Sequence, residues 1–228
     1  MGMKSLLATY RKQWPRVGGV LAMAVGGTAA LASGKLSKSQ LLSLVNFGAV
    51  LVHQYEEYED PGWFPGQFNK GVFKSEDPAH YPLNTNSALC VNTAFAYPFY
   101  LAPVLFPKNK WVGIAPVVFG ISQAITHGIV FPLRAGDRYS PGFLASALLH
   151  TPIGVAYFRA LRQEGDRATG SDFAKGLAYM AAFIGIGVVA PNVLMHDKKS
   201  PYSWPDRQLG HHAPHGKGGT SEMAEESA

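Results

Sequence analysis

The chain is poor in cysteine and in charge. Its 228 residues include one cysteine, Cys90, and only 15% charged residues. A single cysteine excludes an intramolecular disulfide framework and any cysteine-rich zinc or iron–sulfur site. The charged fraction is well below the roughly 25% of an average soluble domain, which excludes a disordered chain and a typical nucleic-acid binder. The charges are missing from long continuous segments, and that pattern indicates a membrane protein.

Six segments contain no Asp, Glu, Lys or Arg: 17–34, 39–52, 81–107, 111–133, 139–158 and 176–195. A membrane-spanning helix needs about 20 mostly apolar residues. Five of these segments are long enough, and the second becomes long enough if it continues through Tyr55. We therefore predict an all-α fold, a polytopic bundle of five to six transmembrane helices joined by short loops.

This pattern divides the chain into three parts: a basic N-terminal arm at 1–16, a transmembrane helical domain at 17–195 and a disordered C-terminal tail at 196–228. The first apolar segment ends in Ala30-Leu31-Ala32, as a signal peptide can. The segment is long and rich in glycine rather than leucine, which favours a retained helix. The tail is polar and contains the cluster His211-His212-Ala213-Pro214-His215, which fits a metal-binding tract or, more simply, a solvated tail.

The distribution of lysine and arginine predicts an orientation in the membrane. These residues are more frequent on the side of the bundle that carries the N-terminus than on the opposite side. Because cytoplasmic loops carry the excess of positive charge, this bias predicts a multi-pass protein with a cytoplasmic N-terminus.

A small set of ionisable side chains remains at membrane depth: His53, Glu56, Glu57, His127 and His150. The amides of Asn46, Asn92 and Gln123 accompany them. Ionisable groups inside a membrane are rare because they are costly to bury, and they mark functional sites by default.

The spacing of these residues is suited to a metal site. His53 precedes Glu56 by three residues and Glu57 by four, so both carboxylates share a helix face with the imidazole. Imidazole and carboxylate together suit zinc, iron or manganese, and helical bundles build metal sites from such pairs one turn apart. Taken singly, Glu56 and Glu57 also fit interfacial carboxylates paired with Lys70 or Arg134, and His127 also fits a packing residue.

Depth in the membrane brings the same residues together. With the N-terminus inside, the second helix ends near His53–Glu57, and Asn92 lies one or two turns into the third. His127 lies about 9 Å from the inner end of the fourth helix, at 1.5 Å per residue. We therefore expect His53, Glu56 or Glu57, and His127 to converge at one site. We expect Asn46, Gln123 and His150 to lie around this site and to contact its ligands.

Several motifs carry a resemblance to a known family. They are His53-Gln54-Tyr55-Glu56-Glu57, then Pro61-Gly62-Trp63-Phe64-Pro65 with Phe68-Asn69, then His127 and Arg138-Tyr139-Ser140-Pro141-Gly142. From about Gln40 to Leu161 the chain resembles the HXXEE domain family of small integral membrane proteins. The resemblance implies no defined reaction, and a metal-dependent enzyme is its natural hypothesis. Family members often carry asparagine where Ser140 stands, which weakens a ligand role for that position.

The leading functional hypothesis is a membrane-embedded metalloenzyme, a hydrolase or oxygenase that acts on a lipid-like substrate from the bilayer. His53, Glu57 and His127 would bind a divalent zinc, iron or manganese ion, with Glu56 as a ligand or as a general base. Asn92 would orient the substrate or stabilise an oxyanion. A transporter or proton carrier that uses the same residues, and a structural protein in which the charges only pair, remain open alternatives. The oligomeric state is also open.

Overall fold

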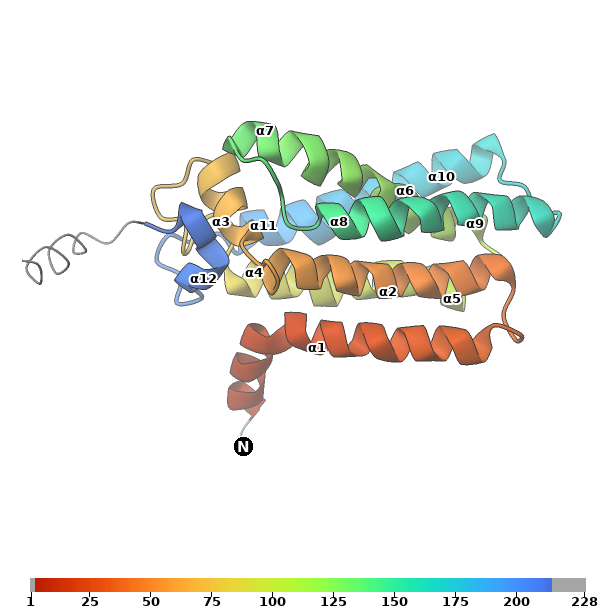
Figure 1. Cartoon of the computed structure of the whole chain (residues 1–228), viewed down its shortest axis with the longest axis horizontal. Helices are drawn as coiled ribbons and strands as arrows, with labels where there is room; N and C mark the ends of the chain where they lie inside the picture. Colours follow the sequence, from red (N-terminus) through yellow and green to blue (C-terminus); the bar gives the residue numbers. More distant parts are fainter. Residues whose placement is uncertain (1–2, 215–228) are drawn as a thin grey trace, which may run out of the picture.

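The computed structural model describes residues 3–214, and within that range all regular secondary structure is helical, without a β-strand. Long helices lie side by side along one axis, and short helices and loops gather at one end (Figure 1). The all-α prediction is confirmed.

Within the described range, four helices are long and apolar enough to cross a membrane. They are α1 (Met3–Ala32), α4–η2–α5 (Thr85–Leu89, Cys90–Phe95, Ala96–Leu105), α6–η3–α7 (Lys110–Ile125, Thr126–Val130, Phe131–Ala135) and α10–η5–α11 (Gly170–Ala182, Phe183–Val189, Ala190–Leu194). The two other expected spans also form long helices, α2 (Lys38–Tyr58) and α8–η4–α9 (Phe143–Ala145, Ser146–His150, Thr151–Gln163). These two are too polar to qualify, so the expected count of five to six is not confirmed.

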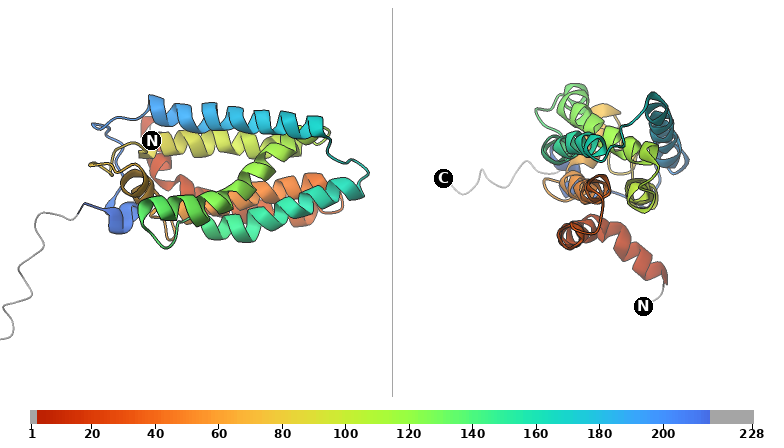
Figure 2. Two further views of the ribbon diagram at one scale, coloured as in Figure 1. Left: turned by 90° about the horizontal axis from the view of Figure 1, so that it is seen from above. Right: turned by 90° about the vertical axis from the view of Figure 1, so that its right-hand side faces the viewer.

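The boundary expected at residue 16 does not appear, because α1 begins at Met3 and includes most of the basic arm. Pro15 lies inside this helix, and the first turns bend away from the rest (Figure 1). Beyond the bend, Val25 and Ala29 pack into the apolar core that α1 shares with α2 and α5. Figure 2 shows α10 and α11 beside α4 and α5, with α6 crossing obliquely between the two halves of the bundle.

Four of the long helices contain a π-helical turn, and in three of them a proline explains it. Proline has no N–H group and cannot continue the regular ladder of hydrogen bonds. The residue before each proline donates instead to the carbonyl five residues back: Phe131 to Thr126, Thr151 to Ser146, and Ala190 to Gly185. Such turns often occur at functional sites, and two of these three carry His127 and His150.

The short helices close one end of the bundle. They are α3 (Phe64–Gly66), the π-helical turn η1 (Gln67–Val72), α12 (Asp206–Leu209) and the 3₁₀ turn η6 (Gly210–His212). A Cβ on Gly66 would lie 2.0 Å from the Leu209 carbonyl oxygen, so only glycine lets α12 approach this closely.

The prediction of a disordered tail is wrong for the part up to residue 214. Trp204 and Leu209 are buried, and the Trp204 indole N–H donates a 2.8 Å hydrogen bond to the Leu83 carbonyl. The Gln208 amide donates to the Tyr58 carbonyl at 2.7 Å. Burial of these apolar groups offsets the entropy of ordering the segment. His215 and the rest of the tail lie outside the described residues.

Candidate metal site

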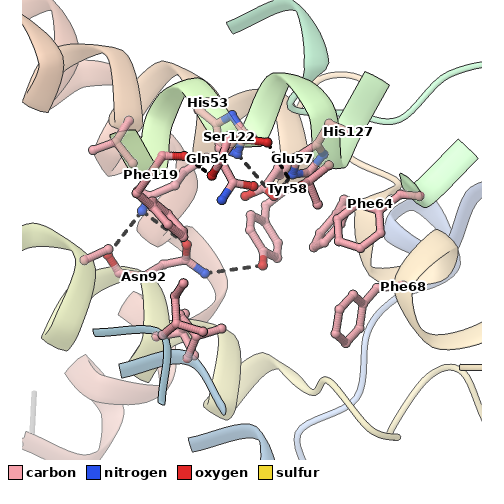
Figure 3. A pocket seen from close by; sticks show the side chains of 18 of the residues that line it. His53, Gln54, Glu57, Tyr58, Phe64, Phe68, Asn92, Phe119, Ser122 and His127 are labelled. Atoms are coloured by element: carbon pink, nitrogen blue, oxygen red, sulfur yellow. Dashed lines mark hydrogen bonds and ion pairs between the residues drawn. The ribbon is translucent and has the colours of Figure 1, made fainter. Parts of the chain in front are cut away.

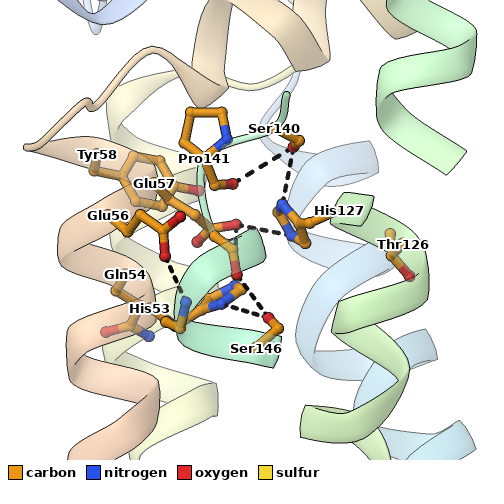
Figure 4. A network of polar contacts seen from close by, with 12 residues as sticks. His53, Gln54, Glu56, Glu57, Tyr58, Thr126, His127, Ser140, Pro141 and Ser146 are labelled. Atoms are coloured by element: carbon orange, nitrogen blue, oxygen red, sulfur yellow. Dashed lines mark hydrogen bonds and ion pairs between the residues drawn. The ribbon is translucent and has the colours of Figure 1, made fainter. Parts of the chain in front are cut away.

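Three side chains converge where α2 ends beside η3 (Figure 4). His53 and Glu57 come from the last two turns of α2, and His127 comes from η3. The Glu57 Oε1 atom lies 3.4 Å from His53 Nε2 and 3.4 Å from His127 Nε2. One ligand atom from each residue lies within 4.8 Å of the other two, and all three residues are buried. The expected convergence of His53, Glu57 and His127 is therefore found.

Two serine hydroxyls determine which nitrogen of each imidazole faces Glu57. Ser146 Oγ donates to the Gly142 carbonyl at 2.7 Å, so it accepts from His53 Nδ1–H at 3.0 Å. Ser140 Oγ lies 3.0 Å from His127 Nδ1 and 3.5 Å from the Pro141 carbonyl oxygen. With the proton of each neutral imidazole on Nδ1, the lone pair on each Nε2 faces Glu57.

In this tautomer the arrangement brings together three electron-pair donors, two Nε2 atoms and one carboxylate oxygen. Ligand atoms 2.0–2.2 Å from a tetrahedral metal lie about 3.3–3.6 Å apart, and the two distances to Glu57 match this separation. Among the described residues no lysine or arginine lines the adjoining cavity, and neither Lys70 nor Arg134 pairs with Glu57. The three residues fit a divalent cation.

Gly142 holds the two histidines at this spacing. Its φ of +102° lies in the left-handed region that favours glycine. A Cβ at this position would lie 2.8 Å from His53 Cε1 and 2.9 Å from His127 Cε1. The Ser140-Pro141-Gly142 motif thus bonds one imidazole through its serine and packs against both through its glycine.

Glu56 does not join the group. Its carboxylate accepts hydrogen bonds from the backbone N–H groups of Leu144 (3.1 Å) and Ala145 (2.8 Å), and from the Tyr139 hydroxyl. These amides belong to the first turn of the helix that starts at Phe143, where a carboxylate satisfies free donors and faces the positive end of the helix dipole. Burial, followed by the contact with Glu56, raises the pKa of Tyr139. Glu56 thus connects the His53–Glu57 part of the motif to the segment that begins at Tyr139.

The other predicted residues surround the three. Asn46 binds His150, whose Nδ1 lies 2.7 Å from Asn46 Oδ1. Asn92 donates to the Ala88 carbonyl at 2.9 Å and to the Tyr58 hydroxyl at 3.3 Å, and it accepts from Gln54 at 3.2 Å. Gln123 lines the adjoining cavity from α6.

A cavity of about 300 Å³ opens beside the site (Figure 3). His53, Glu57, His127 and His150 contribute polar groups to its wall. The remaining wall is mainly apolar and includes Val50, Phe64, Phe68, Val91, Ala96, Phe119, Ile184 and Val188. The three donors therefore face a space that suits an apolar molecule.

Sequence reasoning missed the roles of four residues. The contact of Ser146 with His53, the places of Tyr100 and Gln54 on the cavity wall and the packing role of Gly142 were not predicted, although Gln54 and Gly142 stand in the quoted motifs. The only local signal for Ser146 in the sequence is Pro152, six residues later. Thr151, which precedes this proline, donates to the Ser146 carbonyl and thereby forms the π turn.

Residues 44–157 match the family described as protein of unknown function with HXXEE motif. The chain belongs to this family. The match includes His53, Glu57, His127 and both serines, so the whole site lies within the family domain. Searches of curated proteins and of solved structures find no match.

Proposed function

We propose that this HXXEE protein is a membrane-embedded, metal-dependent enzyme. His53, Glu57 and His127 would hold one divalent cation at the end of the cavity. The observation that carries the proposal is the pair of 3.4 Å separations between Glu57 Oε1 and two Nε2 atoms whose lone pairs are free. A buried carboxylate without a cation is costly, and a metal ion would remove that cost.

The ligand set bears on the chemistry. Two histidines and one carboxylate are the protein ligands of many hydrolytic zinc sites and of non-haem iron oxygenases. Both kinds of site leave coordination positions open for a substrate or water. The bound metal would act as a Lewis acid that polarises a substrate oxygen. The reaction is accordingly proposed as hydrolysis with zinc or oxygenation with iron.

The protein's own residues would bind and orient the substrate. The Asn92 amide is fixed by the Ala88 carbonyl and by Gln54 at the cavity wall, where it would position a polar substrate group. The apolar wall would exclude water and accept a hydrocarbon chain. Because four helices suit a membrane, the substrate would partition from the bilayer.

The test is elemental analysis of the full chain, expressed with zinc, iron and manganese supplied and purified in detergent. The wild-type protein should retain about one metal ion per chain, and His53→Ala should retain none. His80→Ala is the matched control, since His80 pairs with Asp77 outside the site. Absence of metal from the wild-type protein, or equal metal in His53→Ala, would refute the proposal.

A further inference from the structure

Among the described residues, four buried polar atoms on the wall of the cavity have no hydrogen-bond partner: His150 Nε2, Tyr100 Oη, Gln54 Oε1 and Asn192 Oδ1. His150, Tyr100 and Gln54 are 1%, 1% and 2% exposed, respectively. Buried polar atoms are almost always hydrogen-bonded, so four exceptions on one cavity indicate a missing partner. None of the four belongs to the group formed by His53, Glu57 and His127.

Three of these atoms are fixed as acceptors. The Asn192 Nδ2 group donates to the Val188 carbonyl at 2.9 Å, which leaves Asn192 Oδ1 as an acceptor. Asn46 Oδ1 can only accept, so the proton of His150 lies on Nδ1 and a lone pair lies on Nε2. A Cβ on Gly120 would lie 2.6 Å from His150 Nδ1, so the ring is closely packed in this position. The Gln54 Nε2 group donates to the backbone and side-chain oxygens of Asn92, so the Gln54 Oε1 atom points away from Asn92 and remains an acceptor.

The fourth atom, Tyr100 Oη, supplies a donor. The Tyr100 ring centre lies 5.7 Å from that of His150, and its hydroxyl can both donate and accept. The His150 ring centre is also 5.8 Å from that of His53, so this polar wall adjoins the candidate metal site. A ligand group that complements it must offer a hydrogen to an acceptor and an oxygen to a donor.

We propose that the cavity binds a long-chain alcohol, a neutral amphiphile whose hydroxyl donates to His150 Nε2 and accepts from Tyr100. The hydrocarbon chain would lie along the apolar wall between Val50, Phe119 and Val188. For the proposed enzyme, a long-chain alcohol would be a substrate of an oxygenation or the alcohol product that hydrolysis of its ester releases. The inference rests on the proposed function only because it treats the cavity as the substrate site. Binding of the alcohol itself requires no metal.

The test measures binding of radiolabelled 1-dodecanol to the full chain in phosphatidylcholine nanodiscs after chelation of metal, with empty nanodiscs as the control for partitioning. Dodecyl methyl ether has the same chain and oxygen but no O–H. We expect the ether to bind about tenfold more weakly, because it leaves His150 Nε2 unpaired. Equal affinity for alcohol and ether would mean that water satisfies these atoms, and it would overturn the proposal.

His150→Phe keeps an aromatic ring and removes the acceptor. It should reduce dodecanol affinity about tenfold and leave ether affinity unchanged, so that the preference disappears. If this variant does not fold, Tyr100→Phe should weaken binding of both ligands, since both offer it an oxygen. A full preference for alcohol in His150→Phe, or unchanged affinities in Tyr100→Phe, would overturn the proposal. Preference for the alcohol in a protein that never retains metal would support this inference and refute the metalloenzyme. A protein that retains metal but binds alcohol and ether equally would support the metalloenzyme and refute this inference.

Discussion

Residues 3–214 contain two groups of two histidines and one carboxylate, which share their composition but differ in location and in hydrogen bonding. His53, Glu57 and His127 are buried between helices. Asp137, His211 and His212 lie at the end of the bundle, where the side chain of His211 is 57% exposed. We call this second group the clasp, because it joins the C-terminal segment to the loop that follows α7.

The hydrogen bonds distinguish the two groups. In the clasp, His211 Nε2 and His212 Nε2 lie 2.8 Å and 2.9 Å from the Asp137 oxygens, within direct hydrogen-bond distance. Gln67 adds a third donor at 2.7 Å. In the buried group each Nδ1 lies 3.0 Å from a serine hydroxyl, and each Nε2 lies 3.4 Å from Glu57. The clasp is therefore held by direct hydrogen bonds, whereas the spacing in the buried group leaves room for the proposed cation. Residue types alone do not separate these two cases.

The largest expected difference between the groups is in metal affinity. His127→Ala should weaken zinc binding by at least about 100-fold, since it removes a ligand and second-sphere changes alone cost 10–100-fold. The double variant His211→Ala/His212→Ala should bind zinc as the wild-type protein does. Titration against a chelating dye measures both. Loss of affinity in the double variant would show that the clasp is the metal site.

The next effect concerns what holds the C-terminal segment. Leu209 is fully buried, so Leu209→Ala should destabilise the protein by about 2–5 kcal/mol. Leu133→Ala is the control, because Leu133 is 78% exposed and its truncation should change stability little. Unfolding in detergent measures both. Equal stability of the two variants would mean that the clasp, and not apolar packing, holds the segment.

A smaller effect is expected from the serines that orient the imidazoles. Ser146→Ala should reduce zinc affinity about 10–100-fold, because His53 would lose the partner that fixes its tautomer. Ser43→Ala is the matched control in α2, where the hydroxyl only bonds the Ser39 carbonyl. Unchanged affinity in Ser146→Ala would remove the serine from the site.

The smallest effect is the pH dependence of the clasp. Burial raises the pKa of Asp137, but hydrogen bonds from His211, His212 and Gln67 outweigh it and hold that pKa below its ordinary value. A carboxyl with a lowered pKa stabilises the folded state above the unfolded pKa of about 3.9 and loses that effect as the pH falls further. Pepsin should therefore release the C-terminal segment increasingly below about pH 4. Asp137→Asn should lack this increase, and an identical pH profile in the variant would contradict the assignment.

Local periodicity was enough to predict part of the site. The i,i+4 spacing places His53 and Glu57 on one helix face, and membrane depth brings His127 to the same level. The role of Glu56 at the start of the next long helix could not be predicted in this way. It depends on where Leu144 and Ala145 return in space, 88 and 89 residues later in the chain. The hydrogen bonds of Ser140 and Ser146 to the two histidines also depend on contacts between segments that are distant in the sequence.

The C-terminal segment shows a second limit. Composition predicted disorder beyond residue 196, because apolar residues are few there. Two of them, Trp204 and Leu209, enter the cluster with Tyr58 and Phe64, and they order the segment. Sparse apolar residues can order a polar segment when a preformed surface receives them, and sequence composition does not reveal that surface.

The central claim is that the buried group, and not the clasp, holds a divalent metal. X-ray absorption spectroscopy of the zinc-loaded full chain counts imidazole ligands directly. We predict two imidazoles at about 2.0–2.1 Å in the wild-type protein and in His211→Ala/His212→Ala. In Glu57→Gln the metal should be lost while the fold persists. Wild-type protein without bound zinc, together with a destabilisation of Glu57→Gln by about 3–5 kcal/mol, would contradict the account, because Glu57 would then pair with a protonated histidine.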